Sequence, residues 1–145
     1  MPEQIIIGSD HAGFAAKEQV KQYLLSLGCP VDDKGCFSED SVHYPQYGKA
    51  VAGAVSRGEN KRGILICGTG IGMSIVANKF PGVRAALCHN AFTAQACREH
   101  NDANILVMGA RVLDWETMRE IVDLWLNTPF ADGRHAERLA MIECE

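Results

Sequence analysis

The sequence predicts an α/β protein with one doubly wound, Rossmann-like domain over residues 1–145, in which helices cover both faces of a five-stranded parallel sheet. Short runs of aliphatic residues alternate five times with longer segments whose apolar residues recur at helical spacing. The connections between these segments are short, and no repeat, linker or low-complexity stretch interrupts them. A length of 145 residues is typical of one domain.

Each strand and helix is expected from a local signal. Strands buried on both faces lose polar alternation, so uninterrupted aliphatic runs predict them. Helices are expected where apolar residues recur every three or four positions, with glycine or a following proline as the stop. The expected elements are strands at 5–7, 30–33, 64–67, 83–88 and 105–108, and helices at 13–27, 45–57, 73–79, 91–99, 114–126 and from 134 onward.

Composition and charge exclude several classes of protein. Hydrophobic residues make up 47% of the chain and charged residues 22%, which is a globular profile and too apolar for disorder. The formal charge of −4 argues against nucleic acid or an anionic membrane as the main partner. We find no apolar run long enough to span a bilayer and no basic signal-peptide region at the start. We therefore expect a cytoplasmic protein.

The cysteines indicate free thiols. The chain has six, at positions 29, 36, 67, 88, 97 and 144, and no pair has CxxC spacing. Cys97 and His100 are three residues apart and would make half of a metal site, but no second half is visible. We expect no metal and no cofactor.

Chemistry is expected in the loops that follow strands, because ligands of such sheets bind outside the carboxyl ends of the strands. Three such loops carry polar or glycine-rich sequence: Gly8–Gly13 after the first strand, Cys67–Gly72 after the central strand, and Gly109–Arg111 after the last. The glycine loop is neither a dinucleotide fingerprint, since Met73 stands where glycine is needed, nor a Walker loop. Two interpretations of the glycine loop stay open. Its backbone N–H groups form an anion cradle, or the loop is a tight turn that needs positive φ angles.

Two further patterns favour the first alternative. Cys67 stands where a strand ends and a helix begins, a position that can activate a thiol, although a buried strand cysteine would look the same. Arg134 and Arg138 are four residues apart on one helix face and suit a phosphate group. A solvated helix face with Glu137 as their partner would show the same pattern. His43, His89 and His135 show no specific pattern.

Several blocks of the chain resemble the B-type ribose-5-phosphate isomerases and the related allose- and galactose-6-phosphate isomerases. The blocks span nearly the whole chain: GSDHAGF at 8–14, DKG at 33–35, YP at 44–45, ILICGTGIGMSIVANKFPGVRAAL at 64–87, EHNDANILVMGAR at 99–111 and GRHAER at 133–138. His43 departs from the family, where aspartate is common before Tyr-Pro. The resemblance implies a metal-independent aldose–ketose isomerase of carbohydrate metabolism that works through an enediolate, in the pentose phosphate pathway for ribose 5-phosphate.

The resemblance also implies residue roles. Cys67 would be the base that moves a proton between C1 and C2, with Thr69 and the loop Gly68, Gly70, Ile71 and Gly72 holding the enediolate oxygen. His100 would open the furanose ring, assisted by Asn101, with Asp10 close to the sugar oxygens. The phosphate-binding residues would be His11, Arg111, Arg134 and Arg138.

The order of elements adds one inference about assembly. Asp10, Cys67 and Arg111 follow strands, whereas His100 and Asn101 precede the last strand and belong at the opposite edge of the sheet. We therefore expect a homodimer, or a dimer of dimers, whose active sites are shared between subunits. Two alternatives stay open: an isomerase of a six-carbon sugar phosphate such as allose 6-phosphate, and a non-catalytic phosphosugar-binding domain.

Overall fold

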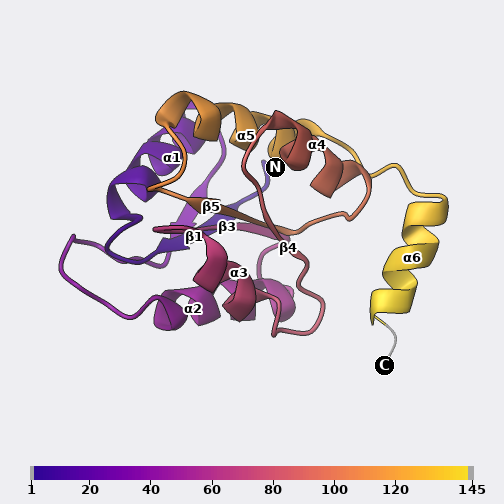
Figure 1. The fold of residues 1–145 in the computed structure, drawn as a ribbon, viewed down its shortest axis with the longest axis horizontal. Coiled ribbons are helices and arrows are strands. Elements are labelled where there is room, and N and C mark those ends of the chain that lie inside the picture. Colours follow the sequence, from indigo (N-terminus) through magenta and orange to yellow (C-terminus); the bar gives the residue numbers. More distant parts are fainter. Residues whose placement is uncertain (1, 144–145) are drawn as a thin grey trace.

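Five parallel strands form the central sheet of the computed structural model, which describes residues 2–143, in the order β2-β1-β3-β5-β4 (Figure 1). The strands are β1 (Ile5–Ser9), β2 (Val31–Asp33), β3 (Arg62–Cys67), β4 (Ala85–Leu87) and β5 (Ile105–Gly109). The helices are α1 (Phe14–Ser26), α2 (Tyr44–Ser56), α3 (Ile71–Ala77), α4 (Ala91–Glu99), α5 (Trp115–Asn127) and α6 (Arg134–Glu143). The predicted fold class is confirmed.

Alternate residues of the strands bury opposite faces of the sheet. Ile5, Ile7, Ile64 and Ile66 pack under one layer, which contains α1, α4 and α5. The residues between them, such as Ile6 and Leu65, pack against α2 and α3 on the other face. Both faces of the sheet are therefore dry, which explains why the strands are aliphatic runs without polar alternation.

Boundaries differ from the sequence expectations by a few residues where local signals are weak. The helix after the glycine loop begins at Ile71, two residues before the expected start, because Gly70 adopts a left-handed φ of 82° that ends the loop there. Strand β4 covers only Ala85–Leu87 of the expected 83–88, because only these three residues pair with β5 at the sheet edge. The expected helix at 91–99 is confirmed, with Asn90 and Thr93 forming a capping box.

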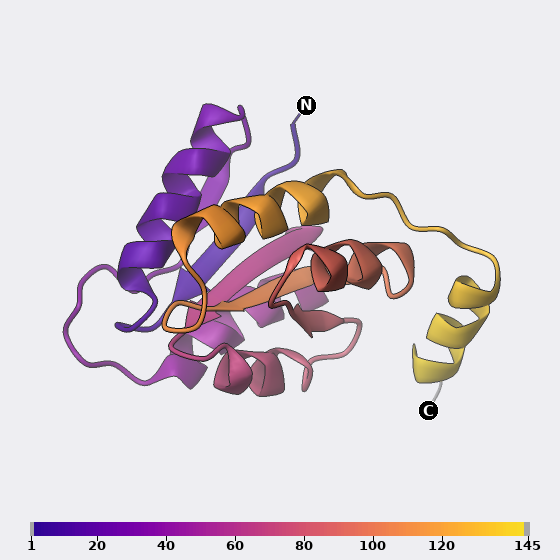
Figure 2. The same cartoon turned by 45° about the horizontal axis from the view of Figure 1, so that its top comes forward.

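Helix α6 lies apart from the two helical layers. It follows an extended segment after α5 and stands beyond the β4 edge of the sheet in both views (Figures 1 and 2). Leu139 is its one buried residue among those described. None of the helices within residues 2–143 has the length and apolar character needed to cross a bilayer.

Candidate functional site

The topology places the glycine loop at a reversal of the strand order. Strand β1 lies between β2 and β3 in the sheet. From the carboxyl end of β1 the chain crosses to β2 on one side, and from the carboxyl end of β3 it crosses to β4 on the opposite side. Such a reversal opens a crevice at the carboxyl ends of the two strands, where ligands of α/β sheets bind. The loop after β1 carries Asp10 and His11, and the loop after β3 carries Cys67–Gly72.

The Cys67 thiol lies inside the turn that ends β3. Its side chain belongs to the core cluster below α2 and α3, and only 5% of the residue is exposed. The Gly70 N–H points at the sulfur, with 3.2 Å between nitrogen and Sγ, and the Ile71 N–H donates to Thr69 Oγ1 at 3.2 Å. A backbone donor is therefore already directed at the group expected to carry charge, and an exposed Thr69 hydroxyl lies beside it.

Glycine is required in this loop by close packing as well as by φ. A Cβ on Gly70 would lie 2.4 Å from Leu87 Cδ1 and 3.1 Å from the Met108 carbonyl carbon. A Cβ on Gly72 would meet the Tyr44 ring at 2.6 Å. The loop is thus packed between β4, β5 and the start of α2, as expected of a tight turn. Its use as an anion cradle stays a prediction.

Three other predicted residues lie at the same edge. Asp10 is 8% exposed, and its Oδ1 accepts the Gly13 N–H at 3.0 Å. His11 Nδ1 accepts the Val42 N–H at 3.1 Å, which leaves Nε2 as the free ring nitrogen. The Arg111 N–H donates to the Gly68 carbonyl at 2.9 Å, and a Cβ on Gly68 would lie 3.4 Å from Arg111 Nη1.

A buried ion pair supports this edge, and sequence reasoning missed its lysine. Lys17 is fully buried on α1, and its Nζ donates to Asp33 Oδ2 at 2.7 Å. Asp33 Oδ1 in turn accepts the Gly35 N–H at 2.9 Å, while the Gly35 carbonyl accepts the Ser9 N–H. The signal was available, because Lys17 shares the buried helix face of Val20 and Leu24.

The charge of this pair is held by opposing effects on the pKa of Asp33. Burial raises the pKa of the carboxyl, but hydrogen bonds from Lys17 and the Gly35 N–H, with the charge of Lys17, outweigh burial and leave the pKa below its ordinary value. Asp33 is therefore ionised at neutral pH and holds the loop after β2 against the end of β1.

A second group of predicted residues lies at the amino end of the sheet. His100 caps the C-terminus of α4, and both His100 and Asn101 are exposed. The His100 ring stacks on His135 of α6, with centroids 4.4 Å apart and planes 16° from parallel. His135 thus has a specific partner that the sequence pattern did not indicate. Arg134 and Arg138 are exposed on the same helix.

The stack depresses the pKa of one of its imidazoles. Loss of hydration is the main cause of the lowered pKa of His135, followed by the positive charges of His100, Arg134 and Arg138, with Glu99 acting in the opposite direction. Neutral His135 is therefore the form that fits beside three potential cations.

Within one chain the two groups do not meet. Cys67 pairs with Gly109 at the carboxyl end of β5, whereas Gly63 pairs with Ile105 at its amino end, just after the His100–Asp102 turn. Four residue steps along a strand span about 13 Å. The structure brings Asp10, His11, the glycine loop and Arg111 together, and it leaves His100, Asn101, Arg134 and Arg138 on the other side.

Two absences bear on the metal and thiol expectations. Among residues 2–143, we find no group of three or more His, Cys, Asp or Glu side chains arranged to hold a metal ion. Cys29, Cys36, Cys67, Cys88 and Cys97 are free thiols, and Cys144 lies outside the described residues.

A sequence profile of the family described as Ribose/Galactose Isomerase matches residues 5–142. The chain belongs to this family. It is 46% identical over 140 residues to ribose-5-phosphate isomerase B of Escherichia coli, covering 97% of this chain and 94% of the relative. It is 41% identical over 142 residues to D-erythrulose-4-phosphate isomerase of Pectobacterium atrosepticum, covering 95% and 91%.

Solved structures of the family share the whole fold. Ribose-5-phosphate isomerase B of Clostridium thermocellum superposes with a TM-score of 0.95 at 50% identity, over 97% of this chain and 95% of that one. The resemblance read from the sequence blocks is therefore confirmed, and the chain is an isomerase.

Proposed function

We propose that the protein interconverts ribose 5-phosphate and ribulose 5-phosphate through an enediolate intermediate, with Cys67 as the base. The observation that carries this proposal is the buried Cys67 sulfur at the carboxyl end of β3, with the Gly70 N–H directed at it from 3.2 Å. The family and the ribose-5-phosphate isomerases among its relatives support the choice of reaction.

The proposed chemistry needs no group beyond side chains and backbone. The Cys67 thiolate takes the proton from C2 of the open-chain aldose and returns it to C1. A second proton passes from the C2 hydroxyl to the C1 oxygen, so the C1 carbonyl becomes a hydroxyl and the C2 hydroxyl a carbonyl. Negative charge on the oxygens peaks in the enediolate, so fixed N–H donors of Gly68–Gly72 and the Thr69 hydroxyl stabilise it without reorganising. Asp10 would bind sugar hydroxyls, and His11 and Arg111 would bind the phosphate from the same chain.

The remaining residues reach this site from a second subunit in our proposal. His100 of the partner subunit would open the furanose ring, assisted by Asn101 of the partner subunit. The stack of His100 on His135 joins the turn to α6, so we infer that the α6 arginines travel with His100. Arg134 of the partner subunit and Arg138 of the partner subunit would then bind the phosphate. Subunit exchange tests this homodimer, whether or not dimers pair further.

Mixing two inactive variants gives a quantitative outcome. In a heterodimer of a Cys67→Ala chain and a His100→Ala chain, one shared site carries both changes and the other carries neither. Random pairing then restores about a quarter of the wild-type activity. Activity that stays at the level of the separate variants would contradict a shared site, provided that mass spectrometry detects the heterodimer.

Phosphorylated sugars of four and six carbons compete with ribose 5-phosphate as the substrate. A relative with 41% identity is named for D-erythrulose 4-phosphate, so phosphorylated sugars of other lengths are the second candidates, allose 6-phosphate among them. We expect turnover of ribose 5-phosphate in deuterated water, with deuterium at the transferred carbon. Higher kcat/KM for the four- or six-carbon substrate would overturn the pentose assignment, and binding without turnover of all three would favour a phosphosugar-binding domain.

We also propose a cytoplasmic location. The five free thiols among residues 2–143 support it, because thiols stay reduced in that compartment.

A further inference from the structure

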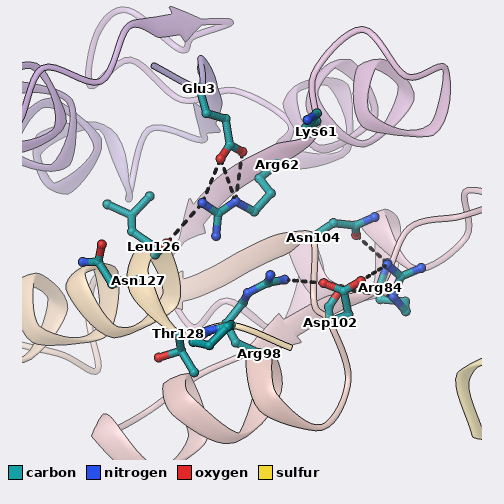
Figure 3. A pocket seen from close by; sticks show the side chains of 11 residues that line it. Glu3, Lys61, Arg62, Arg84, Arg98, Asp102, Asn104, Leu126, Asn127 and Thr128 are labelled. Carbon is teal, nitrogen blue, oxygen red and sulfur yellow. Dashed lines mark hydrogen bonds and ion pairs between the residues drawn. The ribbon is translucent and has the colours of Figure 1, made fainter. Parts of the chain in front are cut away.

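The amino end of the sheet holds a polar pocket of about 480 Å³, and its three arginines, Arg62, Arg84 and Arg98, bond to other groups of the chain (Figure 3). Arg62 donates to both oxygens of Glu3 and to the Trp125 carbonyl at the end of α5. Arg98 donates to Asp102 Oδ1 and to the Ala103 carbonyl, both at 2.9 Å. These guanidinium groups pair with the Glu3 and Asp102 carboxylates and donate hydrogen bonds to carbonyls at a helix end and a turn.

Arg84 differs from its neighbours in the pocket because it joins two separate parts of the proposed site. Its Nε donates to the carbonyls of Asn101 at 3.1 Å and Asp102 at 3.2 Å. Its Nη1 donates to Glu143 Oε1 at 2.8 Å. Glu143 is the last described residue of α6. Arg84 itself is held by its own backbone N–H, which donates to Asn104 Oδ1 at 2.8 Å.

The turn that Arg84 holds is unfavourable on its own. Asp102 has a φ of 46°, in the left-handed region that residues with a side chain rarely adopt. Two arginines compensate for it, since Asp102 Oδ1 accepts from Arg98 and Asp102 Oδ2 lies 3.5 Å from Arg84 Nη2. His100 and Asn101 are the first two residues of this turn, so its conformation sets how they are presented beyond the end of α4.

Helix α6 needs such a contact because little else attaches it. Leu139 is buried against the sheet edge at 9% exposure, and the Ala131 N–H donates to the Glu99 carbonyl before the helix begins. The His135 stack holds the first turn, and the Arg84–Glu143 ion pair holds the last. Met141 and Ile142 are largely exposed. The helix is therefore fixed at its two ends and by one apolar side chain.

We propose that Arg84 is a positioning residue that fixes the His100–Asp102 turn and α6 as one unit, so that the ring-opening pair and the phosphate-binding arginines reach the partner's site in register. This inference rests on the proposed function. Arg84 touches no substrate in it. Its effect is geometric, because small displacements of catalytic groups reduce rates steeply.

Two substitutions in the same pocket separate this role from stability. Arg84→Met removes both connections, whereas Arg62→Met removes a similarly bonded arginine that contacts neither the turn nor α6. We expect Arg84→Met to lower kcat about 10-fold or more and to raise KM by a similar factor, and Arg62→Met to change each less than about 3-fold. Equal kinetic losses for the two variants at equal losses of Tm would overturn the proposal.

A third substitution divides the two connections. Glu143→Gln removes the ion pair to α6 and leaves the bonds from Arg84 to the Asn101 and Asp102 carbonyls in place. We expect KM to rise about 3-fold with kcat unchanged, since only the phosphate arginines lose their register. A fall in kcat that exceeds the rise in KM would contradict the inference that the Arg84–Glu143 ion pair positions only α6.

A spectroscopic readout keeps the test independent of turnover. Proton NMR of the imidazole signals reports the His100–His135 stack through ring-current shifts. We expect these shifts in wild type and in Arg62→Met, and their loss in Arg84→Met. Their persistence in Arg84→Met would overturn the proposal, whereas their loss in a protein whose wild type turns over no sugar phosphate would reject the proposed function alone.

Discussion

The two edges of the sheet are built in different ways. At the carboxyl edge, backbone packs on backbone: a Cβ on Gly13 would lie 2.6 Å from the Ile66 carbonyl oxygen, and one on Gly109 would lie 2.6 Å from the Thr69 backbone. At the amino edge, the exposed turn at His100 and helix α6 are held by long side chains, mainly Arg84 and Arg98. The carboxyl edge is therefore part of the packed core, whereas the turn and helix at the amino edge are attached to the core by arginine side chains.

The difference matches the work proposed for each edge. A proton-transfer base and its N–H donors must be placed before the reaction begins, and the core provides that rigidity. Residues that extend toward a second subunit must stand outside the core, and they gain their position from side-chain networks at its border. Four substitutions or conditions test this division, from the largest expected effect to the smallest.

Cys67→Ala gives the largest effect. Loss of the proposed base should lower kcat by about 10³-fold or more while ribose 5-phosphate still binds, because general-base catalysis contributes factors of this size. Steady-state kinetics and calorimetric titration measure the two parts. Cys29→Ala, a half-buried thiol at the far end of the sheet, is the matched control and should retain activity. Comparable turnover by the two variants would exclude Cys67 as the base.

Gly70→Ala should lower the free energy of unfolding by more than the positive φ angle of Gly70 alone explains. Gly28 has the same left-handed conformation, with a φ of 81° against 82°, but its added Cβ would meet nothing within 4 Å. Alanine at Gly28 should cost about 1–2 kcal/mol of unfolding free energy. At Gly70 the clash with Leu87 and Met108 should add about 1–3 kcal/mol. Urea unfolding of both variants measures the difference, and equal losses would mean that the loop is not packed as described.

Arg138→Ala tests the attached edge by binding. Arg138 is exposed on α6, so its removal should leave Tm unchanged and raise KM about 10-fold with a smaller change in kcat. Arg119→Ala is the control, because Arg119 is a half-buried arginine on α5 that pairs with Glu116 and Asp123. A KM that does not change in Arg138→Ala would remove this residue from the phosphate site.

Mild acid should loosen the same helix slightly. The pKa of His135 is lowered in the folded protein, mainly by lost hydration and then by His100, Arg134 and Arg138, so the proton binds the unfolded state more tightly. This contribution to stability is complete above the ordinary histidine pKa of about 6.5 and is lost as pH falls through the lowered value. Thermal unfolding between pH 7 and pH 5 should therefore show a smaller decline in Tm for His135→Gln than for wild type. His89→Gln, at an exposed position, should follow wild type.

Much of the carboxyl edge could be predicted because its signals are local. Aliphatic runs predict the strands and their burial. Residues that follow parallel strands must share one edge, so the sequence predicts that Asp10, Cys67 and Arg111 lie together. The same rule put His100 and Asn101 at the other edge. The Lys17–Asp33 ion pair could not be predicted from the sequence, because its partners are 16 residues apart and no local pattern connects them.

The sequence by itself determined the order of strands and helices along the chain and the family, and it indicated the candidate catalytic residues, since periodicity and motif spacing are properties of the chain. Only the tertiary structure decided that Gly70 directs its N–H at the Cys67 sulfur, that His135 stacks on His100, and that Arg84 joins the Asn101 turn to the end of α6. These contacts join side chains and backbone groups whose distances depend on how the helices pack on the sheet, and packing is a property of the assembled fold.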